Sequence, residues 1–163
     1  MEANYGPPAS LRALQLIILA MMAGVLAVGV VAVALGSRIT IQPELAPLLL
    51  GILALFGAAE LPVYFVVRAR VLAGLRESVE ASRDTDTDTD AASRVFPAMA
   101  TLTIIGGAMA EGFGLFGGVI CLLTGNRAAL AAPAIALVLL VLRVPTQDKL
   151  SAFAAATVEQ SQG

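Results

Sequence analysis

Four long apolar runs constrain this chain more than any other feature of its sequence. Residues 13–37 carry no charge, 45–67 only Glu60, 97–123 only Glu111, and 126–144 only Arg127 and Arg143 near their ends. A helix needs about 20 apolar residues to cross the hydrocarbon core of a bilayer. With 58% hydrophobic and 13% charged residues, the sequence carries more apolar surface than a soluble domain of this size can bury. We therefore predict an all-α fold, a single integral membrane bundle of four transmembrane helices over residues 1–163.

The first and fourth runs each have an alternative interpretation. The first is longer than the apolar part of a signal peptide, and only Arg12 precedes it closely, so we expect an uncleaved helix; cleavage after Gly36 is the alternative. The uncharged part of the fourth run, residues 128–142, is short. It spans a bilayer only if Asn126 and Arg127 reach up to the headgroups, or if the bilayer thins locally.

The distribution of Lys and Arg predicts the orientation of the chain. With four crossings, one side of the membrane receives eight of these residues, and the other receives only Arg38 and Arg127. The richer side normally faces the cytoplasm. We therefore expect both termini and the loop between the second and third helices to be cytoplasmic.

The connecting segments are polar. Beyond residue 67 the second helix is expected to continue as an amphipathic stretch whose arginines reach anionic headgroups. Residues 77–94 are expected to form a flexible acidic loop, because residues 84–90 alternate Asp and Thr. A calcium loop of the EF-hand type is the disfavoured alternative, because it needs Gly at its sixth position and Glu at its twelfth, which is Val95 here. Residues 146–163 are expected to form a short surface helix and a tail.

Two carboxylates interrupt the apolar runs, and they are the strongest candidates for chemistry. A charged side chain in a bilayer costs at least about 2.5 kcal/mol, so such a residue is normally protonated, paired or turned toward the bundle interior. At helical spacing, Glu111 shares a face with Thr103 and with Gly107, Gly114 and Gly118. The glycines are expected to let another helix pack closely. This face is either a proton or cation site, or a protonated glutamate hydrogen-bonded across a tight interface.

Glu60 has Tyr64 four residues on, so the phenol hydroxyl and the carboxyl can lie on one helix face. Glu60, Glu111, Tyr64 and Thr103 are therefore the candidate ion-binding residues. Glu60 is expected to lie nearer the cytoplasm than Glu111, by about 9 Å at 1.5 Å per residue. We expect the second and third helices to be neighbours.

Other chemistry has little support in the composition. There is no histidine, and Cys121 is the only cysteine. No nucleophile–base pair or metal-ligand cluster appears, so we predict no enzyme activity, catalytic residue, metal site or cofactor. A net charge of −2 argues against nucleic acid as a partner.

Two resemblances to known families follow from local motifs. The segment from Glu111 through Phe116 to Ile120 resembles one helix of the rotor-ring proteolipid (c subunit) of F- and V-type ATPases, which implies proton or sodium binding at Glu111. The C-terminal third resembles a family of small bacterial four-helix membrane proteins of uncharacterised activity. That likeness rests on Glu111-Gly112, Leu115-Phe116, Leu123-Thr124-Gly125-Asn126, Arg143, Pro145-Thr146 and Lys149. It implies the bacterial inner membrane and a tight turn at residues 124–126.

Two functional hypotheses remain open from the sequence. The first is a structural or accessory membrane protein that acts through helix association. The alternative is an ion-coupled membrane element that uses its buried carboxylates for H⁺ or Na⁺. The expected partners are the lipid bilayer and either a second copy of the chain or an unidentified membrane subunit.

Overall fold

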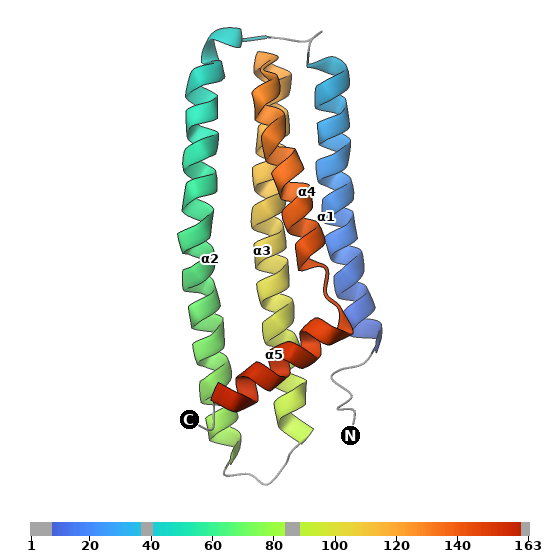
Figure 1. Cartoon of the computed structure of the whole chain (residues 1–163), viewed down its shortest axis with the longest axis vertical. Helices are drawn as coiled ribbons and strands as arrows, with labels where there is room; N and C mark the ends of the chain where they lie inside the picture. The colour runs from blue at the N-terminus through green and yellow to red at the C-terminus, as the bar shows by residue number, and fades with distance from the viewer. Residues whose placement is uncertain (1–7, 37–40, 84–88, 161–163) are drawn as a thin grey trace.

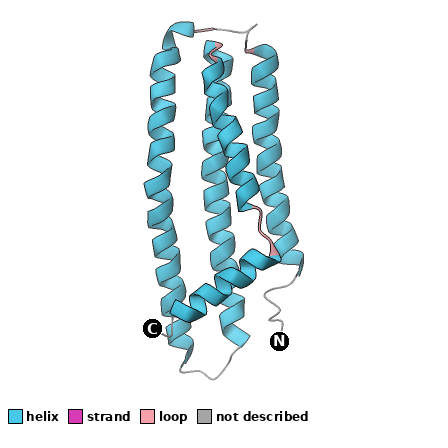
Figure 2. Ribbon diagram, in the orientation of Figure 1, coloured by secondary structure: helices cyan, strands magenta, loops and turns pink. Residues whose placement is uncertain are grey.

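The computed structural model describes residues 8–36, 41–83 and 89–160, and every regular element within these ranges is a helix (Figures 1 and 2). Two 3-10 turns precede the second and fourth helices. In chain order the elements are α1 (Pro8–Leu35), η1 (Pro43–Leu45), α2 (Ala46–Arg83), α3 (Thr89–Thr124), η2 (Arg127–Leu130), α4 (Ala131–Arg143) and α5 (Gln147–Gln160). The prediction of an all-α chain is confirmed.

Three of these helices are long and apolar enough to cross a membrane. The segments concerned are Ser10–Leu35 in α1, Pro43–Leu75 in η1 and α2, and Val95–Thr124 in α3. The predicted fourth crossing, residues 126–144, corresponds to η2 and α4, which reach that length only together with part of α5, across a bend of 72°. The fold is thus compatible with a membrane protein that has three long apolar helices and a shorter fourth.

Helix α3 is the centre of the bundle, and α1, α2 and α4 all pack against it (Figure 1). The expected contact between the second and third helices is therefore present. The outer faces of the surrounding helices carry large exposed apolar side chains, such as Leu16, Leu55 and Leu142. Apolar surface on this scale is typical of helices that face lipid.

The first turn of α1 and the end of α2 lie at the same end of the bundle as α5, which crosses it at a steep angle (Figure 1). Leu150 of α5 is buried there against Val95 and Met99 of α3. Helices α1 to α4 run alternately up and down the bundle, and α5 covers one end (Figure 1).

The connection between α2 and α3 is shorter than the predicted flexible loop over 77–94. Helix α2 continues to Arg83 and α3 begins at Thr89. Alanine, arginine and glutamate, which are common at these boundaries, are favourable in helices. Most of the acidic tract, residues 84–88, lies outside the described residues, as do Ser37 of the first predicted span and residues 161–163 of the predicted tail.

The turn between α3 and η2 has the geometry that the motif Thr124-Gly125-Asn126 predicts. Gly125 has φ = 68°, a conformation that favours glycine. The Asn126 side chain accepts a 3.0 Å hydrogen bond from the backbone N–H of Ala128, which caps η2. The Leu123 carbonyl accepts bonds from the N–H groups of Ile41 and Gln42, so the segment before α2 is tied to the end of α3.

Candidate functional site

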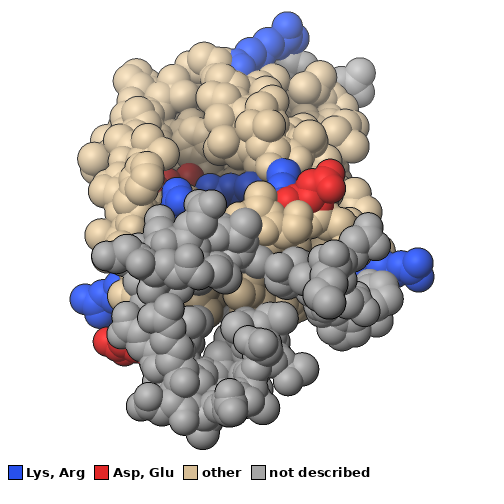
Figure 3. Space-filling model, turned by 60° about the horizontal axis from the view of Figure 1, so that its bottom comes forward, with Lys and Arg blue, Asp and Glu red and all other residues tan. Residues whose placement is uncertain are grey.

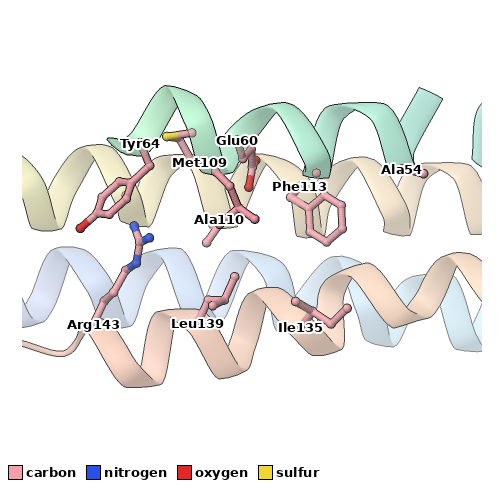
Figure 4. A pocket seen from close by; sticks show the side chains of 12 residues that line it. Ala54, Glu60, Tyr64, Met109, Ala110, Phe113, Ile135, Leu139 and Arg143 are labelled. Atoms are coloured by element: carbon pink, nitrogen blue, oxygen red, sulfur yellow. The ribbon is translucent and has the colours of Figure 1, made fainter. Parts of the chain in front are cut away.

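A cavity of about 370 Å³ lies between α2, α3 and α4 (Figure 4). Most of its wall is apolar, and its polar side chains are Glu60 and Tyr64 of α2 and Arg143 of α4. The lining residues are Ala54, Gly57, Glu60, Leu61, Tyr64, Gly106, Met109, Ala110, Phe113, Ile135, Leu139 and Arg143. Within the part of the chain that the structure describes, this cavity brings together a carboxyl, a phenol and a guanidinium inside the bundle.

The three polar side chains converge from two helices. The guanidinium of Arg143 points from α4 toward α2, with its central carbon 4.6 Å from the centroid of the Tyr64 ring, a cation–π contact (Figure 4). Glu60 lies one turn before Tyr64 in α2 and points into the same cavity (Figure 4). Oε1 of Glu60 and Nη1 of Arg143 are both buried without a hydrogen-bond partner among the described residues. Buried polar atoms are normally satisfied, so these two atoms make this cavity the strongest candidate for a functional site.

Gly106 of α3 makes room for the arginine. A Cβ atom at position 106 would overlap the guanidinium of Arg143 and would lie 3.0 Å from Cε2 of Tyr64. The α3 backbone can therefore lie directly behind the charged group. At the other end of the cavity Gly57 allows the same close approach, because a Cβ there would lie 2.8 Å from the Phe113 ring.

Helix α4 ends at Arg143, and carbonyls at and just beyond this end accept hydrogen bonds from side chains. Lys149 donates hydrogen bonds from Nζ to the carbonyls of Leu142 (2.7 Å) and Val144 (2.9 Å). Gln15 of α1 donates a 2.9 Å bond from Nε2 to the carbonyl of Pro145, a residue that cannot continue the helix. Carbonyls at a helix end need such partners inside a bilayer. These bonds hold the end of α4, and hence Arg143, at the level of Tyr64.

A second cavity, of about 210 Å³, adjoins the first and shares Tyr64 and Arg143 with it. Arg68 and Lys149 also line it, so three cations surround this space. Thr103 lies here as well, but its hydroxyl donates a 2.8 Å bond to the carbonyl of Met99 one turn earlier in α3.

Glu111 lies apart from both cavities. Its Oε1 lies 3.3 Å from the position that a Cβ atom of Gly24 would take, so it faces α1. Gly57 lies against Phe113, and Gly106 lies against Tyr64. In this antiparallel register Glu60 of α2 lies opposite Ala110 of α3, the residue before Glu111, at the same height along the bundle axis. The expected axial offset of about 9 Å is therefore wrong, because the register of α2 and α3 does not align the centres of the two apolar runs. The two acids are level but lie on different sides of α3.

The predicted packing glycines contact helices of the same chain. A Cβ at Gly107 would lie 2.9 Å from Ile18 Cδ1, and one at Gly118 would lie 2.5 Å from Val28 Cγ1, both on α1. At Gly114 it would lie 2.7 Å from the Cβ of Ala136 on α4. Close packing of α3 within the bundle thus depends on these three glycines.

The structure brings together three of the four predicted ion-site residues, Glu60, Tyr64 and Thr103, around the two adjoining cavities. It adds Arg143, which the sequence suggests only as a loop charge that sets orientation. The helical spacing of the sequence could have indicated this place for Arg143. Arg143 lies seven residues after Ala136 and three after Leu140, both buried, so it continues the inward face of α4.

Among the described residues, no group of three or more His, Cys, Asp or Glu side chains is placed to hold a metal ion. No protein-family model, no curated protein and no solved structure matches this sequence. The two family resemblances therefore remain predictions, and the geometry of the cavities is the basis for a functional proposal.

Proposed function

We propose that this chain is an ion-coupled membrane protein in which Glu60 takes up and releases a proton. The observation that carries the proposal is the pair of unsatisfied buried atoms, Glu60 Oε1 and Arg143 Nη1, that line one cavity. Ionisable groups inside membrane bundles commonly mark ion paths and proton relays. In this assignment Arg143 stabilises the charged carboxylate, and protonation releases that interaction.

The neighbouring charges favour a proton over Na⁺ as the ion. A sodium ion bound at Glu60 would share the cavity with the guanidinium of Arg143, and the two cations would repel each other. A proton instead neutralises the carboxyl and adds no cation. Sodium sites also need several oxygen ligands, whereas Glu60 is the only carboxylate among the described residues that line this cavity.

The proposed setting is a four-span protein of the bacterial inner membrane with both termini in the cytoplasm. The end of α4 supports a fourth crossing, because Lys149 and Gln15 donate hydrogen bonds to the carbonyls of Leu142, Val144 and Pro145 at the edge of the apolar core. The Lys and Arg count supports the orientation. The bacterial location rests on the resemblance of the C-terminal third.

Carbodiimide labelling in reconstituted vesicles tests the proton site, because the reagent attacks protonated carboxyls in apolar surroundings. Purified protein is labelled over a pH series with and without Na⁺, and modification of Glu60 is quantified by peptide mass spectrometry. Glu111 serves as the matched carboxyl at the same level, and Glu60→Gln as the blank. Labelling of Glu60 is expected to fall as pH rises, with no protection by Na⁺ at constant pH.

The Arg143→Gln variant sharpens this test. Removing a nearby positive charge disfavours the charged carboxylate, so labelling of Glu60 is expected to persist to higher pH. The profile of Glu111 is expected to stay unchanged. Protection of Glu60 by Na⁺ would favour a sodium site, and a profile that Arg143→Gln leaves unchanged would refute the assigned role of the arginine.

The helix-association hypothesis is less well supported by the geometry. The glycines that suggested it, Gly107, Gly114 and Gly118, face α1 and α4 of the same chain. They are therefore already occupied by intramolecular packing. Association with another subunit stays a prediction that needs a different surface.

A further inference from the structure

We propose that the second cavity binds the phosphate headgroup of an anionic phospholipid, with one acyl chain lying along the opening between α2 and α4. This inference goes beyond the proton site and does not depend on it. Three cations, Arg68, Arg143 and Lys149, come from three different elements and line one space of about 210 Å³. In the view of this end of the molecule, Lys and Arg atoms lie in a recess, with Asp or Glu atoms at its edges (Figure 3).

The three cations are only partly neutralised by the protein. Lys149 donates two of its N–H groups to backbone carbonyls, which carry no formal charge. Among the described residues that line this cavity there is no carboxylate, and the acid of the adjoining cavity is Glu60. An anion with several oxygen acceptors, such as a phosphate, is the complementary ligand.

The depth of the cavity matches the headgroup layer. Tyr64 lies about 29 Å and Arg68 about 35 Å from Leu45 along α2, at 1.5 Å per residue. The hydrocarbon core is about 30 Å thick, so Arg68 reaches the polar layer while Tyr64 marks its inner boundary. This is also the side that the Lys and Arg count places in the cytoplasm, where anionic lipids are recognised by basic pockets between helices.

The adjoining cavity supplies the apolar half of such a site. Above Tyr64 its outer wall is formed by Leu61 of α2 and by Ile135 and Leu139 of α4. Leu61 is 64% and Ile135 50% exposed, so this wall opens toward the surrounding lipid. A cationic recess in the headgroup layer, continued by an apolar groove into the core, fits a two-part ligand. A soluble phosphate would use only the first part.

Native mass spectrometry on the full chain tests the inference. Protein released from detergent micelles that contain phosphatidylglycerol is expected to retain one lipid molecule per chain. Protein released from micelles that contain phosphatidylcholine is expected to retain much less lipid. Arg68→Gln is expected to weaken retention about fivefold, the effect of one cation near an anionic headgroup. The matched control is Arg70→Gln, which removes the same charge two residues away on the same helix and is expected to leave retention unchanged.

Two further arms separate the lipid site from the proton site and from a site for free phosphate. Glu60→Gln is expected to retain the lipid, so loss of the proton site and loss of the lipid site are distinguishable. Inorganic phosphate at the same concentration as phosphatidylglycerol is expected not to displace the lipid. Displacement by free phosphate, equal retention of the two lipids, or equal effects of Arg68→Gln and Arg70→Gln would each overturn the proposal.

Discussion

The close packing of α3 at Gly114 can be tested by comparing the stability of two alanine variants, one at Gly114 and one at Gly112. Gly114→Ala and Gly112→Ala make the same chemical change two residues apart in one helix, so both gain the same helix propensity. A Cβ at Gly114 would lie 2.7 Å from the Cβ of Ala136 and 2.9 Å from Val25 Cγ1, whereas a Cβ at Gly112 meets nothing within 4 Å. The difference between the two variants therefore isolates the packing term.

The size of that difference follows from the contact distances. Carbon atoms pack at about 3.5 Å or more, so α4 must move away from α3 by about 0.8 Å to admit the new methyl group. The Cβ of Ala136 cannot rotate out of the way, so the shift involves backbone. Overpacking of this kind costs about 1–3 kcal/mol, while Ala for Gly in a helix is favourable by up to about 1 kcal/mol. We expect Gly112→Ala to be neutral or stabilising, and Gly114→Ala to be less stable than Gly112→Ala by about 2 kcal/mol.

Cys121 provides the assay, because it is the single cysteine and is only 1% exposed. Its rate of reaction with a thiol-specific dye reports how often the bundle opens. A difference of about 2 kcal/mol corresponds to labelling about 30-fold faster in Gly114→Ala than in Gly112→Ala. Equal labelling rates in the two variants would refute the argument that α4 packs directly on Gly114.

Three further predictions concern single positions. Gly106→Ala is expected to displace the guanidinium of Arg143, because the arginine side chain is flexible. The carbodiimide labelling of Glu60 is then expected to follow the profile of Arg143→Gln, with little change in Cys121 reactivity. A wild-type labelling profile would contradict the placement of the arginine. Gly125→Ala is expected to cost about 1 kcal/mol because of the left-handed backbone, measured as roughly fivefold faster Cys121 labelling, and a neutral result would contradict that conformation. Lys149→Met is expected to increase amide hydrogen exchange in the last turn of α4, and unchanged exchange would show that its caps do not hold that turn.

Much of the fold follows from the apolar runs alone, because a helix that crosses lipid must be long and nearly free of charge. The turn at Gly125 is also predictable, since few residues other than glycine tolerate its backbone conformation. The boundaries of α2 and α3 are less so, because helices continue beyond the lipid wherever the sequence allows it.

The candidate site could be predicted only in part. The four-residue spacing of Glu60 and Tyr64 places them on one face, which is a local property of a helix. The contribution of Arg143 is not local: it depends on where α4 ends, which Pro145, Gln15 and Lys149 determine. Counting Lys and Arg for orientation treats Arg143 as a surface charge and so hides its place in the bundle. The separation of Glu111 from Glu60 likewise depends on the register between helices, which no single run encodes.

The electrostatic pairing of Glu60 with Arg143 across the cavity is the claim on which the proposed function depends, and a double-mutant cycle measures it directly. Stability of the wild type, Glu60→Gln, Arg143→Gln and the double variant is compared through Cys121 labelling at neutral pH. Each single change leaves an uncompensated charge in the bundle, so the double variant is expected to be more stable than the sum of the two predicts, by about 0.5–3 kcal/mol. Strictly additive effects would show that the two side chains do not interact.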